Sequence, residues 1–362
     1  MMVPDAAASS PNPVPEEYKH CKKQGDLLYC LSLLAEEGVD PRARSNTREY
    51  PLPEENNWKK EICENPTGRN MRVYRDRFNI CFFRDIDVRI VRIPTFRTVG
   101  TATFVLRGEA ATSGVAGGPA SIEHTITRVS ATGLGSTASL RWGAWMMTAK
   151  KESVSVTEKI TSAEEHTFLY RPGQSAGSVQ DFHLGYAVQV VSKAGSTYGG
   201  LVESPPLIRC DAALKKGTRP GCVSTGKAIY AVGRGNKTYY AHVRAAIKSG
   251  LPSTLTRTMD SSLIDENRKI ACRRGVPSPR PEGKECDEYP FASTREGAAS
   301  SGGPARSHSS LKCGLKDPDR TGAGGFSRCL IDAKHNSAGG TELGIFYTDQ
   351  RVLNGEKFGV RV

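Results

Sequence analysis

Apolar and polar residues alternate over the middle of the chain, beginning near residue 78. Val88, Ile90 and Ile93 interleave with Arg89 and Arg92. Similar runs, separated by clusters of Gly, Ser and Pro, are Thr101–Leu106, Ser139–Met147, Val154–Ile160, Thr167–Tyr170, Tyr186–Val191 and Ala228–Val232. Period-two alternation is typical of half-buried strands, and turn residues between short strands favour antiparallel pairing. The pattern predicts an N-terminal, antiparallel, sandwich-like β-rich domain over residues 78–249.

The region before this domain, residues 1–77, has a different pattern. Its first 16 residues are rich in Pro, Ala and Ser, which predicts a disordered tail. Leucines near helical spacing, including Leu27, Leu31 and Leu34, predict a helix over Glu17–Glu37. We therefore expect a Pro-rich tail and a helical lead-in, followed by a polar, irregular segment.

The end of the chain predicts a second, smaller domain. A Pro-, Ser- and Thr-rich stretch predicts a linker over residues 250–261, and the composition shifts after it. Within residues 262–362, residues 330–331 are strand-like and His335–Gly340 reads as a glycine-containing loop. An apolar i, i+3, i+4 face starting at Leu343 then predicts a helix. The expected fold class of the whole chain is α+β.

The chain has ten cysteines, which bear on the cellular compartment in which the protein resides. Neighbouring cysteines lie close in sequence, which suggests five local loops: Cys21–Cys30, Cys63–Cys81, Cys210–Cys222, Cys272–Cys286 and Cys313–Cys329. Spacing alone leaves the connectivity open. Zinc binding is the alternative, but no C-x-x-C occurs and no Cys-His cluster has ligand spacing. Disulfides imply an oxidising compartment and hence a secreted protein.

Two further observations bear on location. No apolar run approaches the roughly 20 residues that a membrane helix needs, so no membrane association is expected. The first residues do not resemble a signal peptide, and we expect that an export signal was removed before the numbering begins. A cytosolic protein is the competing interpretation, which the cysteines oppose.

The charge of the chain suits a polyanionic partner. The net charge is +12, from 50 Lys and Arg against 38 Asp and Glu. The part from Ser262 onward holds 16 Lys and Arg against 13 Asp and Glu, so it is only mildly basic. Basic proteins bind DNA, RNA or anionic wall polymers, although solubility also explains such a charge.

Two stretches of the second domain carry candidate chemistry. The first is Cys286-Asp-Glu-Tyr-Pro-Phe-Ala-Ser-Thr-Arg-Glu-Gly297, with the carboxylates Asp287, Glu288 and Glu296. The second, Cys329–Gly340, contains Asn336 near the start of a predicted helix. Phosphodiester hydrolysis needs a base for water and a metal for phosphate charge, and hard cations prefer oxygen ligands. An ordinary polar turn and an ordinary loop are the structural alternatives.

These residues also carry a family resemblance. Cys286–Thr294, Glu296-Gly297, Asn336-Ser-Ala-Gly-Gly340 and Arg351-Val-Leu, in this order, resemble the NucA/NucB family of secreted bacterial deoxyribonucleases. The cysteine-rich form is most similar to versions in actinobacterial secreted proteins. The resemblance covers about residues 262–362 and implies a small module of the ββα-metal type. It implies endonucleolytic cleavage of DNA with little sequence preference.

The resemblance also implies roles for single residues. It makes Asp287 the general base and Asn336 the residue associated with a divalent metal, Mg²⁺ or Mn²⁺. Glu288 and Glu296 match acidic positions of the family pattern, and each could bind the ion through water or orient the loop. His335 stands where the family commonly has Asp, so it could add a metal ligand or remove one.

Basic side chains near the two motifs are candidate contacts to backbone phosphates. The predicted substrate-binding residues are Arg295, Lys334 and Arg328. Further candidates in the Gly/Ser/Arg-rich stretch between the motifs are Arg306, Lys312, Lys316 and Arg320, for which a solvated loop is the equal alternative. Such contacts would give salt-sensitive binding without sequence readout.

Other features receive structural interpretations. Gly233–Thr238 resembles a phosphate-binding loop but lacks its spacing, so it predicts a hairpin turn between two strands. The remaining histidines, including His242 and His308, lack zinc-site spacing and are predicted to be surface or hydrogen-bonded residues.

The sequence thus predicts a secreted, monomeric, metal-dependent endonuclease acting on DNA, with RNA as an alternative substrate. One rival hypothesis is an inactive nuclease-like module on a secreted protein whose β-rich domain binds wall polymer, glycan or nucleic acid. Another is a nuclease toxin delivered to competing bacteria.

Overall fold

The computed structural model describes residues 14–33, 63, 72–118, 120–148, 153–156, 160–161, 166–192, 195–215 and 219–362. It is mostly antiparallel sheet with three α-helices, so the predicted α+β class is confirmed. The chain forms two compact units, the second of which contains Asp211–Val362 together with two short earlier segments. The predicted linker at 250–261 lies inside this second unit. No helix among the described residues is long and apolar enough to cross a membrane.

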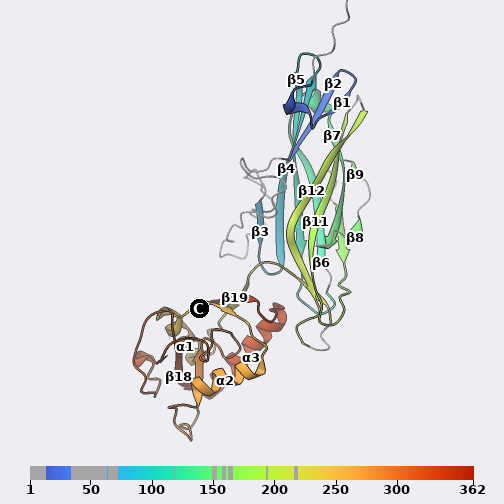
Figure 1. Cartoon of the computed structure of the whole chain (residues 1–362). Helices are drawn as coiled ribbons and strands as arrows, with labels where there is room; N and C mark the ends of the chain where they lie inside the picture. The colour runs from blue at the N-terminus through green and yellow to red at the C-terminus, as the bar shows by residue number, and fades with distance from the viewer. Residues whose placement is uncertain are drawn as a thin grey trace, which may run out of the picture. The chain divides into compact units, whose positions relative to one another are not determined.

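The first unit contains two sheets of long strands (Figure 1). One has the order β1-β2-β4-β5-β6-β10, with β3 also paired to β4. Its strands are β1 (Lys22–Gln24), β2 (Leu27–Leu33), β3 (Arg72–Arg75), β4 (Asn79–Arg92), β5 (Arg97–Ala111), β6 (Ala120–Gly133) and β10 (His166–Tyr170). In the other, the strands of this unit have the order β12-β11-β7-β8, with β9 on β7. Its strands are β7 (Ser139–Thr148), β8 (Ser153–Val156), β9 (Ile160–Thr161), β11 (Val179–Ser192) and β12 (Gly195–Asp211).

The buried faces of these two sheets meet in a common core. Phe82 of β4 stacks on Tyr186 of β11, with the ring centroids 6.1 Å apart, a spacing typical of aromatic pairs. His124 of β6 donates or accepts a 2.9 Å hydrogen bond with the Tyr186 hydroxyl and contacts Trp142 of β7 edge-on. Residues alternate between buried and partly exposed along β5, as the sequence pattern predicts. The sandwich-like packing follows from this alternation.

The helix predicted over Glu17–Glu37 is wrong where the structure describes it. Only a 3₁₀ turn, Glu16–Tyr18, precedes the β1–β2 hairpin, and residues 34–37 lie outside the described residues. Gly25 adopts a φ of 60° at the hairpin turn, and the Cys21–Cys30 disulfide closes the hairpin. Short apolar runs do not distinguish strand from helix, and here the turn and the disulfide select the strand.

The second unit contains two three-stranded sheets and the three helices. Strand β14 (Ala228–Ala231) runs parallel to β19 (Lys357–Arg361), which pairs antiparallel with β15 (Thr254–Thr256). In the other sheet β16 (Lys284–Tyr289) is antiparallel and β17 (Ala305–Arg306) parallel to β18 (Phe326–Asp332). The remaining elements are β13 (Gly221–Ser224), α1 (Lys237–Lys248), α2 (Ser261–Cys272), the 3₁₀ turn Ser309–Leu311 and α3 (Ala333–Asp349).

Two local predictions fail in this unit. Gly233–Thr238 is not a hairpin turn, because it connects β14 to helix α1. The stretch 250–261 contains β15, and Asp260 at its end caps α2 by accepting hydrogen bonds from the amides of Ser262 and Leu263. Its Pro, Ser and Thr residues therefore belong to an ordered part of the domain.

Strands β16 and β18 lie between helices on both faces. On one face, Tyr289 and Ile331 belong to a core that includes Val243 of α1 and Leu343 of α3. On the opposite face, Cys286 and Leu330 pack with Ala271 and Cys272 of α2. We call these the α1 face and the α2 face. Because side chains alternate along a strand, neighbouring residues of β16 lie in two different environments.

The cysteines are paired as the local spacing suggested. Disulfides join Cys21–Cys30, Cys63–Cys81, Cys272–Cys286 and Cys313–Cys329, and Cys210 and Cys222 are also disulfide-bonded.

Arg351, the first residue of the last resemblance motif, is a structural residue. Its guanidinium is 1% exposed and forms an ion pair of 2.7 Å with the buried carboxylate of Asp211. It also donates a 2.6 Å hydrogen bond to the Asp211 carbonyl. A buried arginine needs such a partner, and this pair joins the two ends of the second unit.

Candidate nuclease site

Asp287 lies in the middle of β16 on the α1 face and is 6% exposed. Its Oδ2 lies 2.6 Å from Nδ1 of His242, a fully buried residue of α1. Nε2 of His242 lies 2.8 Å from Oγ of Ser327 on β18, and the same oxygen lies 3.0 Å from Nε2 of His308. The structure therefore places the predicted base at the end of a buried chain of polar side chains.

His242 and His308 were not predicted as part of the site. His242 lies 45 residues before Asp287, and only the packing of α1 on β16 brings the two together. One signal was present in the sequence: His242 precedes Val243 in an amphipathic segment whose buried residues are Tyr239, His242, Val243 and Ala246. A histidine in an apolar helix stripe indicates a buried polar partner, although it does not identify that partner.

Glu288 follows Asp287 but points to the α2 face. One carboxyl oxygen lies 3.3 Å from Sγ of Cys272 in the Cys272–Cys286 disulfide. Burial, followed by the nearby charge of Asp287, raises the pKa of Glu288 to about 8. The carboxyl group is therefore mostly protonated at neutral pH. The two adjacent carboxyl groups differ in partner and in the face of the sheet they occupy.

Glu296 and its surroundings hold the first motif in place. The two carboxylate oxygens of Glu296 accept hydrogen bonds from the amide and hydroxyl of Thr256, at 2.8 and 2.7 Å. Buried Asn267 of α2 donates to the carbonyls of Ala292 and Thr294. A Cβ on Gly297 would lie 2.4 Å from the Asn267 amide, so a glycine is needed there. Much of the motif thus fixes the loop after β16.

Asn336 lies in the first turn of α3, which begins at Ala333. Asp332 caps the helix by accepting from the amides of Lys334 and His335. Asn336 is partly exposed and its Nδ2 lies 3.4 Å from a carboxylate oxygen of Glu285. Glu285 precedes Asp287 by two residues on β16, so both carboxylates are on the same face.

The predicted loop over His335–Gly340 is wrong, because these residues are helical. A Cβ on Gly339 would lie 2.6 Å from the ring of Tyr239 in α1. The glycine allows α1 and α3 to approach closely, and that approach places α3 beside β16. The ring of His335 contacts α1 as well, with Nδ1 3.0 Å from the Thr238 hydroxyl.

Residues 243–361 match the family model described as Deoxyribonuclease NucA/NucB. The second unit carries a NucA/NucB-type nuclease domain. The match covers about a third of the chain and begins one residue after His242, so the first unit lies outside it. Neither a curated protein nor a solved structure matches the chain.

The candidate phosphate-binding residues of the NucA/NucB domain separate into two groups. Arg295 and Lys334 are exposed, as are Lys312, Lys316 and Arg320. Arg328 is buried: it forms an ion pair with Asp317 at 2.7 Å and donates to the Ala271 and Arg274 carbonyls. Arg306 is also buried and donates to several backbone carbonyls, including that of Gly322. These two guanidinium groups hold loops together, so the prediction that they contact phosphate does not fit their positions.

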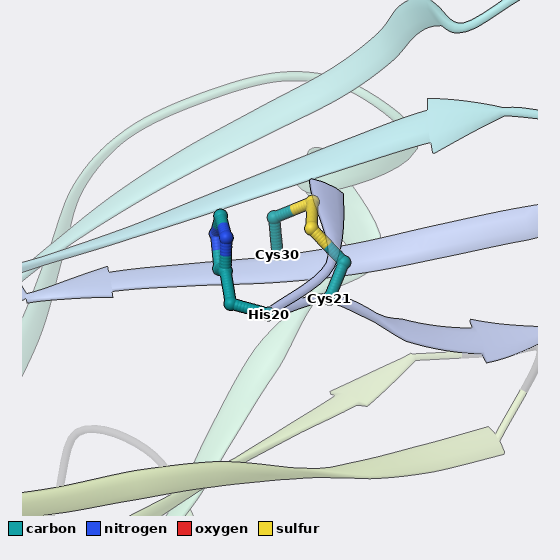
Figure 2. A group of neighbouring side chains, drawn as sticks. All are labelled: His20, Cys21 and Cys30. Carbon is teal, nitrogen blue, oxygen red and sulfur yellow. A yellow bond between two sulfur atoms is a disulfide. The ribbon is translucent and has the colours of Figure 1, made fainter. Parts of the chain in front are cut away.

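The metal-binding potential of the NucA/NucB domain depends on oxygen atoms. The described residues form two groups of three or more His, Cys, Asp or Glu ligands within reach of one ion, and neither is in this domain. His20, Cys21 and Cys30 form one, but a disulfide occupies both sulfurs (Figure 2). The other contains the disulfide-bonded Cys63 and Cys81. Near the start of α3, the Asn336 amide and the Glu285 carboxylate lie together. A few oxygen donors suit Mg²⁺ or Mn²⁺, which retain much of their water shell.

Proposed function

We propose that the NucA/NucB domain is a metal-dependent endonuclease that hydrolyses DNA phosphodiester bonds, with Asp287 as the general base. The observation that carries the proposal is the environment of Asp287. Within the described part of the chain, Oδ2 of Asp287 has one hydrogen-bond partner, His242, and Oδ1 has none. The side chain keeps 8% exposure. Oδ1 is therefore the atom available to a water molecule.

The reaction follows from this assignment. Oδ1 of Asp287 takes a proton from water as the water oxygen attacks phosphorus in line. A new P–O bond forms, the bond to the leaving ester oxygen breaks, and the leaving oxygen takes a proton from solvent water. The divalent ion, when bound, neutralises negative charge on the phosphate. We assign Asn336 as the residue that holds this ion, with His335 beside it and Glu285 as a second oxygen donor.

The other predicted catalytic carboxylates receive supporting roles. Glu288 faces α2 and is largely uncharged at neutral pH, which makes it a poor base there. Glu296 uses both oxygens to orient the loop through Thr256. The exposed Arg295 and Lys334 are the proposed phosphate contacts, and contacts to backbone phosphates carry no base sequence. The disulfides support an extracellular location, since they persist in oxidising compartments.

The proposal is tested with closed circular plasmid, linear duplex DNA and RNA, using the purified, disulfide-bonded full chain and Mg²⁺ or Mn²⁺. We expect closed plasmid to be nicked, which requires internal cleavage, and we expect EDTA to stop the reaction. Asn336→Ala should raise the metal concentration that gives half the maximal rate, whereas Ser337→Ala, an exposed neighbour on α3, should not. An inert wild-type chain with intact disulfides would overturn the proposal.

A further inference from the structure

The side chains of Asp287, His242, Ser327 and His308 form one continuous hydrogen-bonded chain. They come from β16, α1, β18 and the residue before the 3₁₀ turn Ser309–Leu311. The three contacts measure 2.6, 2.8 and 3.0 Å. His242 and Ser327 are fully buried and His308 is 8% exposed. Four elements thus converge on one carboxyl group.

The donors and acceptors in this chain are determined once Asp287 is ionised. A carboxylate can only accept, so Nδ1 of His242 must donate to Oδ2 of Asp287. In a neutral imidazole the other nitrogen then accepts, so the Ser327 hydroxyl donates to Nε2 of His242. The Ser327 oxygen in turn accepts from Nε2 of His308. Every contact is then satisfied in a single direction.

The surroundings agree with this arrangement. Burial, with the neighbouring His242 as the next cause, lowers the pKa of His308 to about 4, so His308 is neutral at pH 7. Other titratable groups whose charge interacts with Asp287 are Tyr239 on α1, Tyr230 on β14 and Glu288 on its own strand. Burial raises the pKa of all three, so they are mostly uncharged at pH 7. Glu285, on the same face, is exposed.

We propose that His242 is a positioning residue for the nuclease reaction. By donating from Nδ1 it holds Asp287 in one orientation and leaves Oδ1 directed to the attacking water. Ser327 and His308 act through His242, because they fix the tautomer that carries its proton on Nδ1. This inference rests on the proposed function of Asp287 as the base.

The test compares kcat and KM for DNA cleavage by the full chain and three α1 variants. His242→Phe removes the donor, so the side chain of Asp287 loses the contact that holds it in one orientation. We expect kcat to fall by about 10- to 100-fold, the worth of one hydrogen bond to a charged group, with KM little changed. His242→Asn, whose amide can donate from near the Nδ1 position, should restore part of the lost kcat.

The control is Tyr239→Phe, which changes the same helix beside Asp287 but leaves the His242 donor. It should leave kcat near the wild-type value. A merely structural role of His242 would lower Tm but leave the kcat of the folded protein near wild type, and that result in a folded His242→Phe variant would overturn the inference. A wild-type chain without nuclease activity would instead overturn the proposed function, so the two failures are distinguishable.

A second measurement needs no variant. The ¹⁵N chemical shifts of the imidazole nitrogens of the wild-type chain at pH 7 report which nitrogen of His242 carries the proton. We expect a proton on Nδ1. A ring protonated only on Nε2 would overturn the inference, because it could not donate to Asp287.

Discussion

The two faces of strand β16 place adjacent carboxyl groups in different surroundings. On the α1 face, Asp287 has a hydrogen-bond donor from His242 and keeps slight exposure. On the α2 face, Glu288 lies against a disulfide, and burial raises its pKa to about 8. A donor favours the charged form of a carboxyl group, and burial without enough donors favours the neutral form. Two carboxyl groups one residue apart are thus suited to different tasks.

The same division continues across β18. Ser327 lies opposite Tyr289 on the α1 face and belongs to the chain that ends at Asp287. Arg328 lies opposite Glu288 on the α2 face. There it forms an ion pair with Asp317 and donates hydrogen bonds to one carbonyl in α2 and one in the turn after it. The residues proposed to take part in the reaction therefore lie on the α1 face, and the α2 face contains contacts that stabilise the domain.

The largest expected effect separates the two carboxyl groups directly. Asp287→Asn should lower kcat/KM for DNA cleavage by about 10²–10⁴-fold, the usual contribution of a general base. Glu288→Gln keeps the uncharged form that Glu288 already has at neutral pH, so its activity should stay near wild type. Steady-state rates at pH 7 check both variants. A loss of similar size in Glu288→Gln would break the comparison.

Breaking the ion pair on the α2 face should affect stability rather than chemistry. Arg328→Ala leaves the mostly buried carboxylate of Asp317 without its partner, which should lower the free energy of unfolding by about 3–5 kcal/mol. Urea denaturation measures the change, with Arg320→Ala, an exposed arginine in the same stretch, as the control. If folded Arg328→Ala loses DNA affinity at unchanged stability, the structural assignment of Arg328 is wrong.

The raised pKa of Glu288 gives the stability of the domain a specific pH dependence. Between the ordinary glutamate pKa near 4.5 and about 8, the folded state holds a proton that the unfolded state has lost. The contribution of Glu288 is therefore present below this range and is lost as the pH rises through it. The slope from one proton is at most about 1.4 kcal/mol per pH unit. Urea denaturation from pH 5 to 9 should show that Glu288→Gln removes this slope; an unchanged slope would contradict the assignment.

The smallest expected effect concerns the exposed basic residues. Lys334→Gln and Arg295→Gln should each weaken DNA binding and reduce the slope of log K against log salt by about 1. Binding can be measured on the Asp287→Asn background so that the DNA remains intact. Equal salt slopes in all variants would show that neither side chain contacts a phosphate.

Sequence reasoning succeeded where local pattern decides the structure. Alternation predicted strands such as Thr101–Leu106 within β5, and neighbouring cysteines predicted the disulfides. The motif order around Asp287 and Asn336 predicted the NucA/NucB resemblance that the family match confirms. These features depend on residues close together in the sequence.

Predictions were wrong or missing where contacts between residues far apart in the sequence determine the structure. The strand β2 was predicted as a helix, because a leucine-rich run fits both and only the β1–β2 hairpin selects one. The glycines after His335 suggested a loop, whereas Gly339 accommodates Tyr239 across a helix pair. His242 and His308 reach Asp287 only through tertiary packing, so spacing could not reveal them.

The most direct test of the central claim is a metal cycle on closed circular plasmid, run in parallel with the wild-type chain and Asp287→Asn. The nicking rate is measured with Mn²⁺ or Mg²⁺, after EDTA, and after the ion is restored. The account predicts a wild-type rate that is lost with EDTA and recovers with the ion, and an Asp287→Asn rate that stays low throughout. Wild-type nicking that persists in EDTA, or Asp287→Asn nicking at the wild-type rate, would contradict it.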